Sequence, residues 1–194
     1  MKTYRRSPST ATFAMLTASL LALSLGGCGY GRIQMLDEAV LRARSEIEVH
    51  LRRRAELVPN LLETIRNYGS IGGGAVERVA DARAGLDDAV RESDLSEMEE
   101  WNARLSESLS ELLGTLRFDS ELAGDPSYQL LRSQLEETQE QVARASRAYN
   151  DAVARYNQFI SGFPQIVTAK MVGAERLRRF EPWDSVAVPH PADQ

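Results

Sequence analysis

The sequence predicts an all-α protein, folded as an elongated antiparallel up-and-down bundle of four helices, two of them long. Apolar residues recur every three or four positions over long stretches, and no stretch of comparable length shows a strand pattern. Charged residues make up 26% of the chain and aromatic residues 7%, a composition typical of solvated amphipathic helices. A chain of 194 residues is long enough for one folded unit with a real core.

The first long helix is expected from about residue 35, in a bundle that spans residues 35–180. Its apolar stripe consists of Leu36, Val40, Ala43, Ile47, Leu51, Val58, Leu61, Ile65 and Tyr68, with Arg54 interrupting it. A second helix is expected over residues 75–92. A third, from about residue 96 to 116, begins with a capping-box pattern of Ser96 and Glu99, and its stripe includes Trp101.

The fourth helix has the most regular apolar pattern. A heptad seam runs through Tyr128, Leu131, Leu135, Thr138, Val142, Ala145, Tyr149, Ala152, Tyr156 and Phe159. Asp125 followed by Pro126 predicts its start, and Gly162 with Pro164 its end. A short helix and an irregular hook are expected after it. Residues 181–194 are expected to form a flexible tail, because they are polar and rich in proline.

The N-terminus resembles a bacterial lipoprotein signal peptide, expected over residues 1–27. Basic residues precede an apolar run that is short for a membrane-spanning helix. The run ends in Leu25, Gly26, Gly27 and Cys28, which resemble a lipobox. The resemblance implies that Cys28 becomes the first mature residue and carries the lipid, with residues 28–34 as a short tether. The alternative is an uncleaved signal anchor with an unmodified Cys28.

These features predict an extracytoplasmic lipoprotein that is attached to the membrane through Cys28. Gly29, and not Asp, follows the cysteine, which favours the periplasmic face of the outer membrane if the source has two membranes. Removing residues 1–27 changes the formal net charge from −5 to −8, because this segment holds three basic residues and no acidic ones. An acidic envelope domain is not expected to bind nucleic acid. A single cysteine excludes disulfides within the monomer.

Two sequence blocks resemble the LemA family. The first, "LRRRAELVPNLLETIRNYG", carries the arginine pair Arg53 and Arg54, followed by Pro59 and Asn60. The second, "LLRSQLEETQEQVARASRAYNDAVARYNQFISGFPQIVTAKMVG", carries two Tyr-Asn pairs, Tyr149-Asn150 and Tyr156-Asn157. The resemblance implies a helical fold and membrane association, and it does not imply a biochemical activity.

Pro59 and Arg54 each have two interpretations. Pro59 has no N–H for the carbonyl of Ala55, so it predicts a kink in the helix. The kink either shapes the bundle or marks a ligand or hinge site. Asn60 is expected to supply a polar contact near the opened turn. Arg54 continues the apolar stripe, so we expect an internal ion pair with a carboxylate of the fourth helix, at Glu136, Glu137 or Glu140. Recognition of a partner is its alternative role.

The Tyr-Asn pairs also have a structural interpretation. Tyr149 and Tyr156 lie on the heptad seam, where aromatic residues belong to the core. Asn150 and Asn157 lie beside the seam, where they are expected to bond across helices or to cap the exposed end.

No catalytic residue, cofactor or metal site is predicted. Glu46 and His50 lie one helical turn apart, but two ligands do not make a metal site and nothing nearby supplies more. No pattern for a serine nucleophile occurs. The leading hypothesis is a non-enzymatic envelope protein that binds an envelope partner. One alternative is a ligand- or metal-binding accessory protein, in which the Pro59 kink opens a cavity lined by Arg54, His50 and carboxylates of the fourth helix. The other is a protein that assembles with itself as a homo-oligomer.

Overall fold

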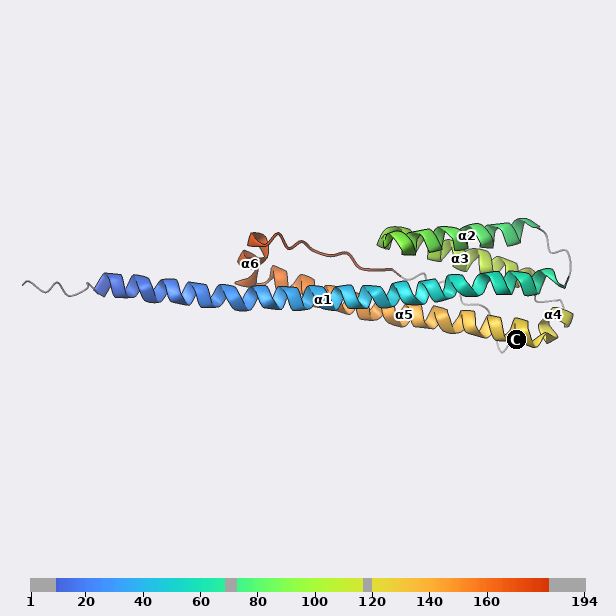
Figure 1. Ribbon diagram of the computed structural model, residues 1–194, viewed down its shortest axis with the longest axis horizontal. Helices are drawn as coiled ribbons and strands as arrows, with labels where there is room; N and C mark the ends of the chain where they lie inside the picture. The colour runs from blue at the N-terminus through green and yellow to red at the C-terminus, as the bar shows by residue number, and fades with distance from the viewer. Residues whose placement is uncertain (1–9, 69–72, 117–119, 182–194) are drawn as a thin grey trace, which may run out of the picture. The chain divides into compact units, whose positions relative to one another are not determined.

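The computed structural model describes residues 10–68, 73–116 and 120–181, with side chains from residue 29 onward. Six helices lie in these ranges (Figure 1): α1 (Thr10–Arg66), α2 (Gly73–Glu92), α3 (Leu95–Leu116), α4 (Ser120–Gly124), α5 (Pro126–Ser161) and α6 (Gln165–Met171). Every regular element of the described ranges is helical, which confirms the all-α class. Of the predicted tail, residues 182–194 lie outside the described part.

The chain forms two compact units. The first combines residues up to 40 with residues 153–177, and the second combines residues 41–152 with the chain from residue 178 onward. Helices α1 and α5 contribute to both units, while α2, α3 and α4 belong to the second and α6 to the first.

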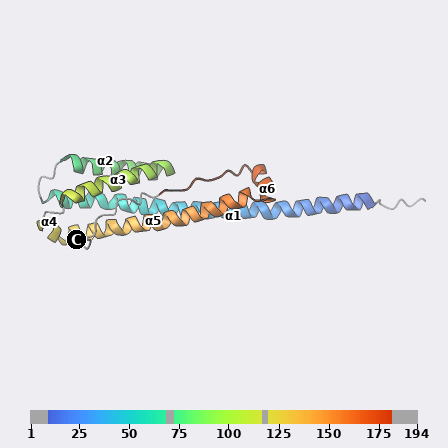
Figure 2. The same cartoon turned by 180° about the vertical axis from the view of Figure 1, so that it is seen from behind.

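The second unit is the predicted up-and-down arrangement of four helices. Helices α2 and α3 lie side by side in both views (Figures 1 and 2). They are antiparallel, because Arg78 near the start of α2 pairs with Glu111 near the end of α3 at 2.6 Å. Helices α1 and α5 are also antiparallel, since Tyr68, just after α1, donates to Asp125, just before α5, at 2.5 Å.

The turn between α2 and α3 differs from the predicted capping box. Helix α3 begins at Leu95, and its cap is Asp94, whose Oδ1 accepts the N–H groups of Ser96 at 2.8 Å and Glu97 at 3.1 Å. Ser93 has a φ of 54°, which reverses the chain before this cap. The prediction that Ser96 and Glu99 cap the helix is wrong, because the cap is Asp94, two residues closer to the turn.

Two helix boundaries differ from the prediction. Helix α1 begins at Thr10 instead of about residue 35, so residues 28–34, the predicted tether, are helical in the full chain. The segment before residue 35 is rich in Ala and Leu, which are strong helix formers. The short helix α4 was not predicted. It buries Leu122 fully, which gives this segment a place in the core.

The predicted stripes form most of the core. On α5, eight of the ten seam residues are buried, while Leu131 and Phe159 are only partly buried. Ser146, Val153 and Ile160 are buried beside the seam. They lie one position after seam residues, as expected when a helix of 3.6 residues per turn drifts from a seven-residue repeat. Tyr68, the last residue of the predicted first stripe, lies just after α1, is 38% exposed and is not part of the core.

Candidate functional site

Arg54 lies in the core of the second unit. Its side chain is 3% exposed. Nη1 donates to Oδ1 of Asn102 at 2.5 Å, and Nη2 donates to Oγ of Ser106 at 2.9 Å. The Ser106 hydroxyl in turn donates to the backbone carbonyl of Asn102 at 2.8 Å. A guanidinium group is therefore held between α1 and α3 by neutral oxygen atoms.

The position of Arg54 was predicted correctly, but its partner was not. Each of the three predicted partners bonds along α5 instead: Glu136 pairs with Arg132 at 3.1 Å, Glu140 pairs with Arg144 at 3.2 Å, and Glu137 accepts from Gln141 at 3.0 Å. These carboxylates lie on exposed positions of α5 and have partners one turn away. The predicted internal ion pair is therefore wrong.

The burial of Arg54 leaves one donor unused. Its Nε is buried and has no hydrogen-bond partner. Desolvation lowers the pKa of Arg54 to about 10, so the group still carries its charge at neutral pH. A buried charge without a counter-charge is costly, and the unpartnered Nε adds to that cost.

A cavity of about 30 Å³ lies beside Arg54. Its polar lining comes from α1, α3 and α5, while three leucines supply the rest: the polar residues are Arg54, Ser106, Ser110, Arg132, Glu136 and Gln139. The ligand-site hypothesis placed a cavity lined by Arg54, His50 and α5 carboxylates near Pro59. Arg54 and Glu136 do line the observed cavity, whereas His50 and Pro59 do not.

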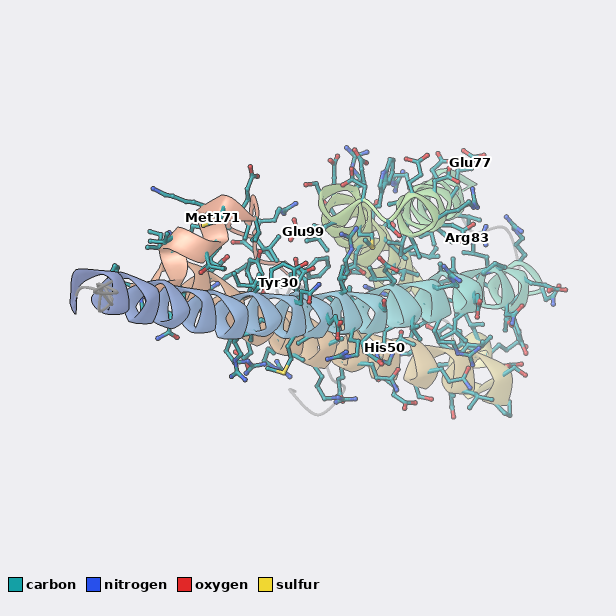
Figure 3. All side chains as sticks on the ribbon, turned by 60° about the vertical axis from the view of Figure 1, so that its left-hand side comes forward. Tyr30, His50, Glu77, Arg83, Glu99 and Met171 are labelled. Atoms are coloured by element: carbon teal, nitrogen blue, oxygen red, sulfur yellow. The ribbon has the colours of Figure 1, made fainter. Side chains whose placement is uncertain are left out.

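Pro59 lies on the exposed side of α1, and the helix continues through it. The carbonyl of Ala55, which lacks its helical donor, accepts Nε of Arg83 from α2 at 3.4 Å. Figure 3 shows Arg83 on the side of α2 that faces α1. Asn60 was expected to supply the polar contact near this turn, but its side chain is exposed and Arg83 supplies the contact. Arg53 is also exposed and lies 3.8 Å from Glu56.

The two asparagines of the Tyr-Asn pairs hold the chain that follows α6. In the first unit, Asn157 donates from Nδ2 to the carbonyl of Leu177 at 2.8 Å and accepts its N–H at 2.9 Å. In the second unit, Asn150 makes the same two bonds with Phe180, at 2.7 and 2.8 Å. Each amide therefore satisfies both backbone groups of one residue. We call these two contacts the asparagine clasps. The expectation that the asparagines bond across helices or cap an exposed end is wrong.

The tyrosines of these pairs are core residues, as predicted. Tyr149 is 4% exposed and Tyr156 is 5% exposed. The Tyr149 hydroxyl donates to the carbonyl of Arg178 at 3.1 Å, next to the Phe180 clasp. Burial raises the pKa of both tyrosines, and Asp37 adds to this effect at Tyr156.

The C-terminal segment has a further attachment that the sequence analysis missed. Glu99 accepts the N–H of Glu181 at 2.6 Å and pairs with Arg178, which also donates to Ser96. Ser96 and Glu99 are the two residues that were expected to cap α3. Glu181 was assigned to the flexible tail, but its backbone is bonded here. Phe180, beside it, is fully buried.

No group of three or more metal-ligating residues occurs in the described part of the chain. His50 lies 4.0 Å from Glu46, as one turn of helix requires, and nothing joins them to a third ligand there.

The family model of the LemA family matches residues 43–190. This chain belongs to the LemA family. The match includes Arg54, Pro59, both Tyr-Asn pairs and the residues that they clasp, so the LemA resemblance of both blocks is confirmed. No curated protein matches the chain.

The residues that resemble a lipobox lie before the matched LemA region. Leu25, Gly26, Gly27 and Cys28 fall within α1, and their side chains lie outside the described part. Gly29 is the first residue whose surroundings are described: a Cβ placed there would lie 3.2 Å from Oγ1 of Thr168 on α6. Helix α6 is therefore next to the residue that follows Cys28. In the described residues, no helix is both long and apolar enough to cross a membrane.

Proposed function

We propose that this LemA-family protein is a lipid-anchored, non-enzymatic interaction or assembly module at a membrane surface of the cell envelope. The lipid would be attached to Cys28. The observation that carries the proposal is an exposed apolar face on the first unit, formed by Phe163, Val167 and Met171, which are 86%, 53% and 83% exposed. We call these three residues the α6 face.

Val167 and Met171 are four positions apart and so share one side of α6, while Ala169 on the opposite side is buried at 3% exposure. Phe163 precedes the helix by two residues. Figure 3 shows Met171 on α6, with Tyr30 on α1 in the same unit. Lys170 lies next to Met171 and can reach anionic lipid head groups. Large apolar side chains rimmed by polar residues are typical of a membrane or protein contact.

The α6 face is close to the proposed lipid. Gly29 lies against Thr168, so an acyl chain on Cys28 starts one residue from the contact with α6. A single acyl chain anchors a protein only marginally, and stable attachment takes a second signal. Further acyl chains on Cys28 and the α6 face could both supply that signal. The first unit would then face the membrane.

The second unit supports the interaction role. Its helices are held by internal contacts such as the Arg54 network, while Leu41, Val49 and Leu130 are 54%, 59% and 58% exposed. These residues offer contact points to an envelope partner, or to a second copy of the chain in the self-assembly alternative. The proposed location is the periplasmic face of the outer membrane if the source has two membranes.

The lipid and the partner are tested together by labelling cells with an alkyne fatty acid and crosslinking intact envelopes. The wild type is expected to incorporate the label and to give crosslinks to another envelope protein, while Cys28→Ala incorporates none. Because Lys2 and Lys170 are the only lysines of the sequence, the crosslinker should couple carboxylates, and mass spectrometry then identifies the linked residues. Equal labelling of both proteins would refute the lipid at Cys28, and links between copies of this chain alone would favour self-assembly.

The α6 face is tested by the distribution of the protein between membranes and buffer at high salt. Phe163→Ser combined with Met171→Ser is expected to weaken retention by the membrane, because the apolar area that enters the interface is lost. Leu130→Ser is the control, since Leu130 is also apolar and is 58% exposed but lies on the second unit. Equal retention of both variants would show that the α6 face does not contact lipid.

A further inference from the structure

We propose that the cavity beside Arg54 binds a monovalent anion of the size of chloride. This site is separate from the proposed membrane role, because it lies within the second unit and uses none of the residues of the α6 face. The argument rests on the charge, the donors, the size and the accessibility of the cavity.

The charges around the cavity leave one positive group without a counter-charge. Three charged residues line it: Arg54, Arg132 and Glu136. Arg132 and Glu136 pair with each other, with 3.1 Å between Nε and Oε1. Within the described ranges, Arg54 bonds only to the neutral side chains of Asn102 and Ser106. A bound anion would offset the cost of burying this guanidinium group.

The cavity wall also carries hydrogen-bond donors. The unpartnered Nε belongs to Arg54, which lines the cavity and is 3% exposed. Ser110 brings a hydroxyl group to the wall and Gln139 brings an amide group. Nitrogen and oxygen donors of these kinds surround anions in proteins, whereas a cation would be repelled by the positive charge of Arg54.

The size of the cavity restricts the class of ligand. A site needs roughly 10–15 Å³ to hold one water molecule. The observed 30 Å³ is larger than this, and suits a chloride ion, which is slightly larger than water. It is too small for a nucleotide or a sugar phosphate.

An ion can reach the site without opening the core. Arg132 and Glu136 line the cavity, yet their side chains are 33% and 48% exposed. The cavity therefore extends from the buried Arg54 to the surface of α5. Exchange with solvent is expected to be rapid, which suits a measurement on chloride itself.

The experiment measures the ³⁵Cl NMR line width of chloride in the presence of the purified full chain in detergent. The wild type is expected to broaden the line beyond a detergent blank, and bromide is expected to reverse the broadening by competition. Arg54→Met should reduce the excess broadening to the level of the blank. Arg53→Met is the matched control, because Arg53 is the exposed neighbour on the same helix.

Two further variants make the result decisive. If Arg54→Met does not fold, Ser110→Met fills the cavity and leaves both hydrogen bonds of Arg54 in place, and it should also remove the broadening. Glu136→Gln removes the negative charge of the wall and should strengthen chloride binding several-fold. No excess broadening by the wild type, or equal broadening in Arg54→Met and Arg53→Met, would overturn the proposal. Broadening only in Glu136→Gln would also overturn it, since Glu136 would then be the counter-ion of Arg54 in the wild type.

Discussion

Arg83 donates from Nε to the backbone carbonyl of Ala55 at 3.4 Å, and this is the carbonyl that Pro59 leaves without a helical partner. A proline inside a helix removes one backbone hydrogen bond, at a cost of roughly 3 kcal/mol in an isolated helix. The bond is long, so it offsets only part of that cost. It nevertheless connects α2 to the turn of α1 in which the carbonyl of Ala55 has no helical donor.

The first prediction is that Arg83 and Pro59 are energetically coupled. Arg83→Met is expected to lower the free energy of unfolding by about 1 kcal/mol in the wild type, and by less in a Pro59→Ala background, where residue 59 supplies its own N–H. Urea unfolding of the two single variants and the double variant measures the coupling. Arg91→Met is the control, because Arg91 pairs with acids on its own helix and should be additive with Pro59→Ala. Strict additivity for Arg83 would contradict the prediction.

The sequence predicts the side of α1 on which Arg54 lies, but not its neighbour. The apolar stripe places Arg54 inside, and the structure confirms this. The choice of α5 as the source of a partner was wrong, because a stripe does not say which helix covers each of its residues. Asn102 and Ser106 were the available signal: two polar residues one turn apart on the buried face of α3, between Met98 and Leu109.

The asparagine clasps were less accessible to sequence reasoning. The repeat of Asn150 and Asn157 was visible, but the partners are backbone groups in a segment without periodicity. Asn150 and Asn157 are seven residues apart, whereas Phe180 and Leu177 are three residues apart, so the two pairs share no spacing in the sequence. The pairing can be recognised only once the partner segment is known.

The second prediction is that each clasp protects the backbone that it binds. Asn157→Ala is expected to speed amide hydrogen exchange at Leu177 about tenfold, because the N–H loses its only acceptor in the clasp. Asn150→Ala should act in the same way at Phe180. Hydrogen exchange with mass spectrometry measures both sites. Asn60→Ala is the control, since Asn60 is an exposed asparagine on α1. Unchanged exchange at Leu177 and Phe180 would show that the clasps do not hold the segment.

The third prediction concerns the contact between α2 and α3 at Gly85. A Cβ at Gly85 would lie 2.3 Å from the ring of Trp101, so the ring would have to move. Trp101 was predicted to be a core residue, but it is only partly buried and lies against this glycine. Gly85→Ala is expected to lower the free energy of unfolding by about 1–3 kcal/mol and to change the fluorescence of Trp101. Gly114→Ala is the control, because nothing lies within 4 Å of a Cβ there, and a helical alanine should stabilise the protein. A stabilising Gly85→Ala would contradict the contact.

The fourth prediction is a loss of stability at alkaline pH through Tyr149. Burial raises the pKa of Tyr149, so the unfolded chain releases this proton first as the pH rises. The stabilisation is complete below the unfolded pKa of about 10 and is lost as the pH rises through the higher folded value. Tyr149→Phe is expected to be less stable than the wild type near neutral pH by about 1 kcal/mol, because the bond to Arg178 is lost, and to lose less stability between about pH 8 and pH 10.5.

Urea unfolding at the two pH values tests this prediction. Tyr128 and Tyr156 also have raised pKa values, so the decline should become shallower and not disappear. Asn150→Ala is the control, because it releases the same segment without removing a titrating group. Parallel declines for Tyr149→Phe and the wild type would assign the alkaline loss to other groups.

The fifth prediction separates the burial of Arg54 from the stability that its network provides. Asn102→Leu alone leaves Nη1 of a buried guanidinium group without its acceptor, and should lower the free energy of unfolding by about 2–4 kcal/mol. Replacing all three members, by Arg54→Met, Asn102→Leu and Ser106→Ala together, removes the charge with its acceptors and should restore stability to near the wild-type value. Urea unfolding measures both variants. If the triple variant is less stable than Asn102→Leu, the network stabilises the bundle outright. If the free energy of unfolding of the triple variant returns to near the wild-type value, the stability of the bundle does not require the charge of Arg54. Binding of the proposed anion would then be a function that does require this charge.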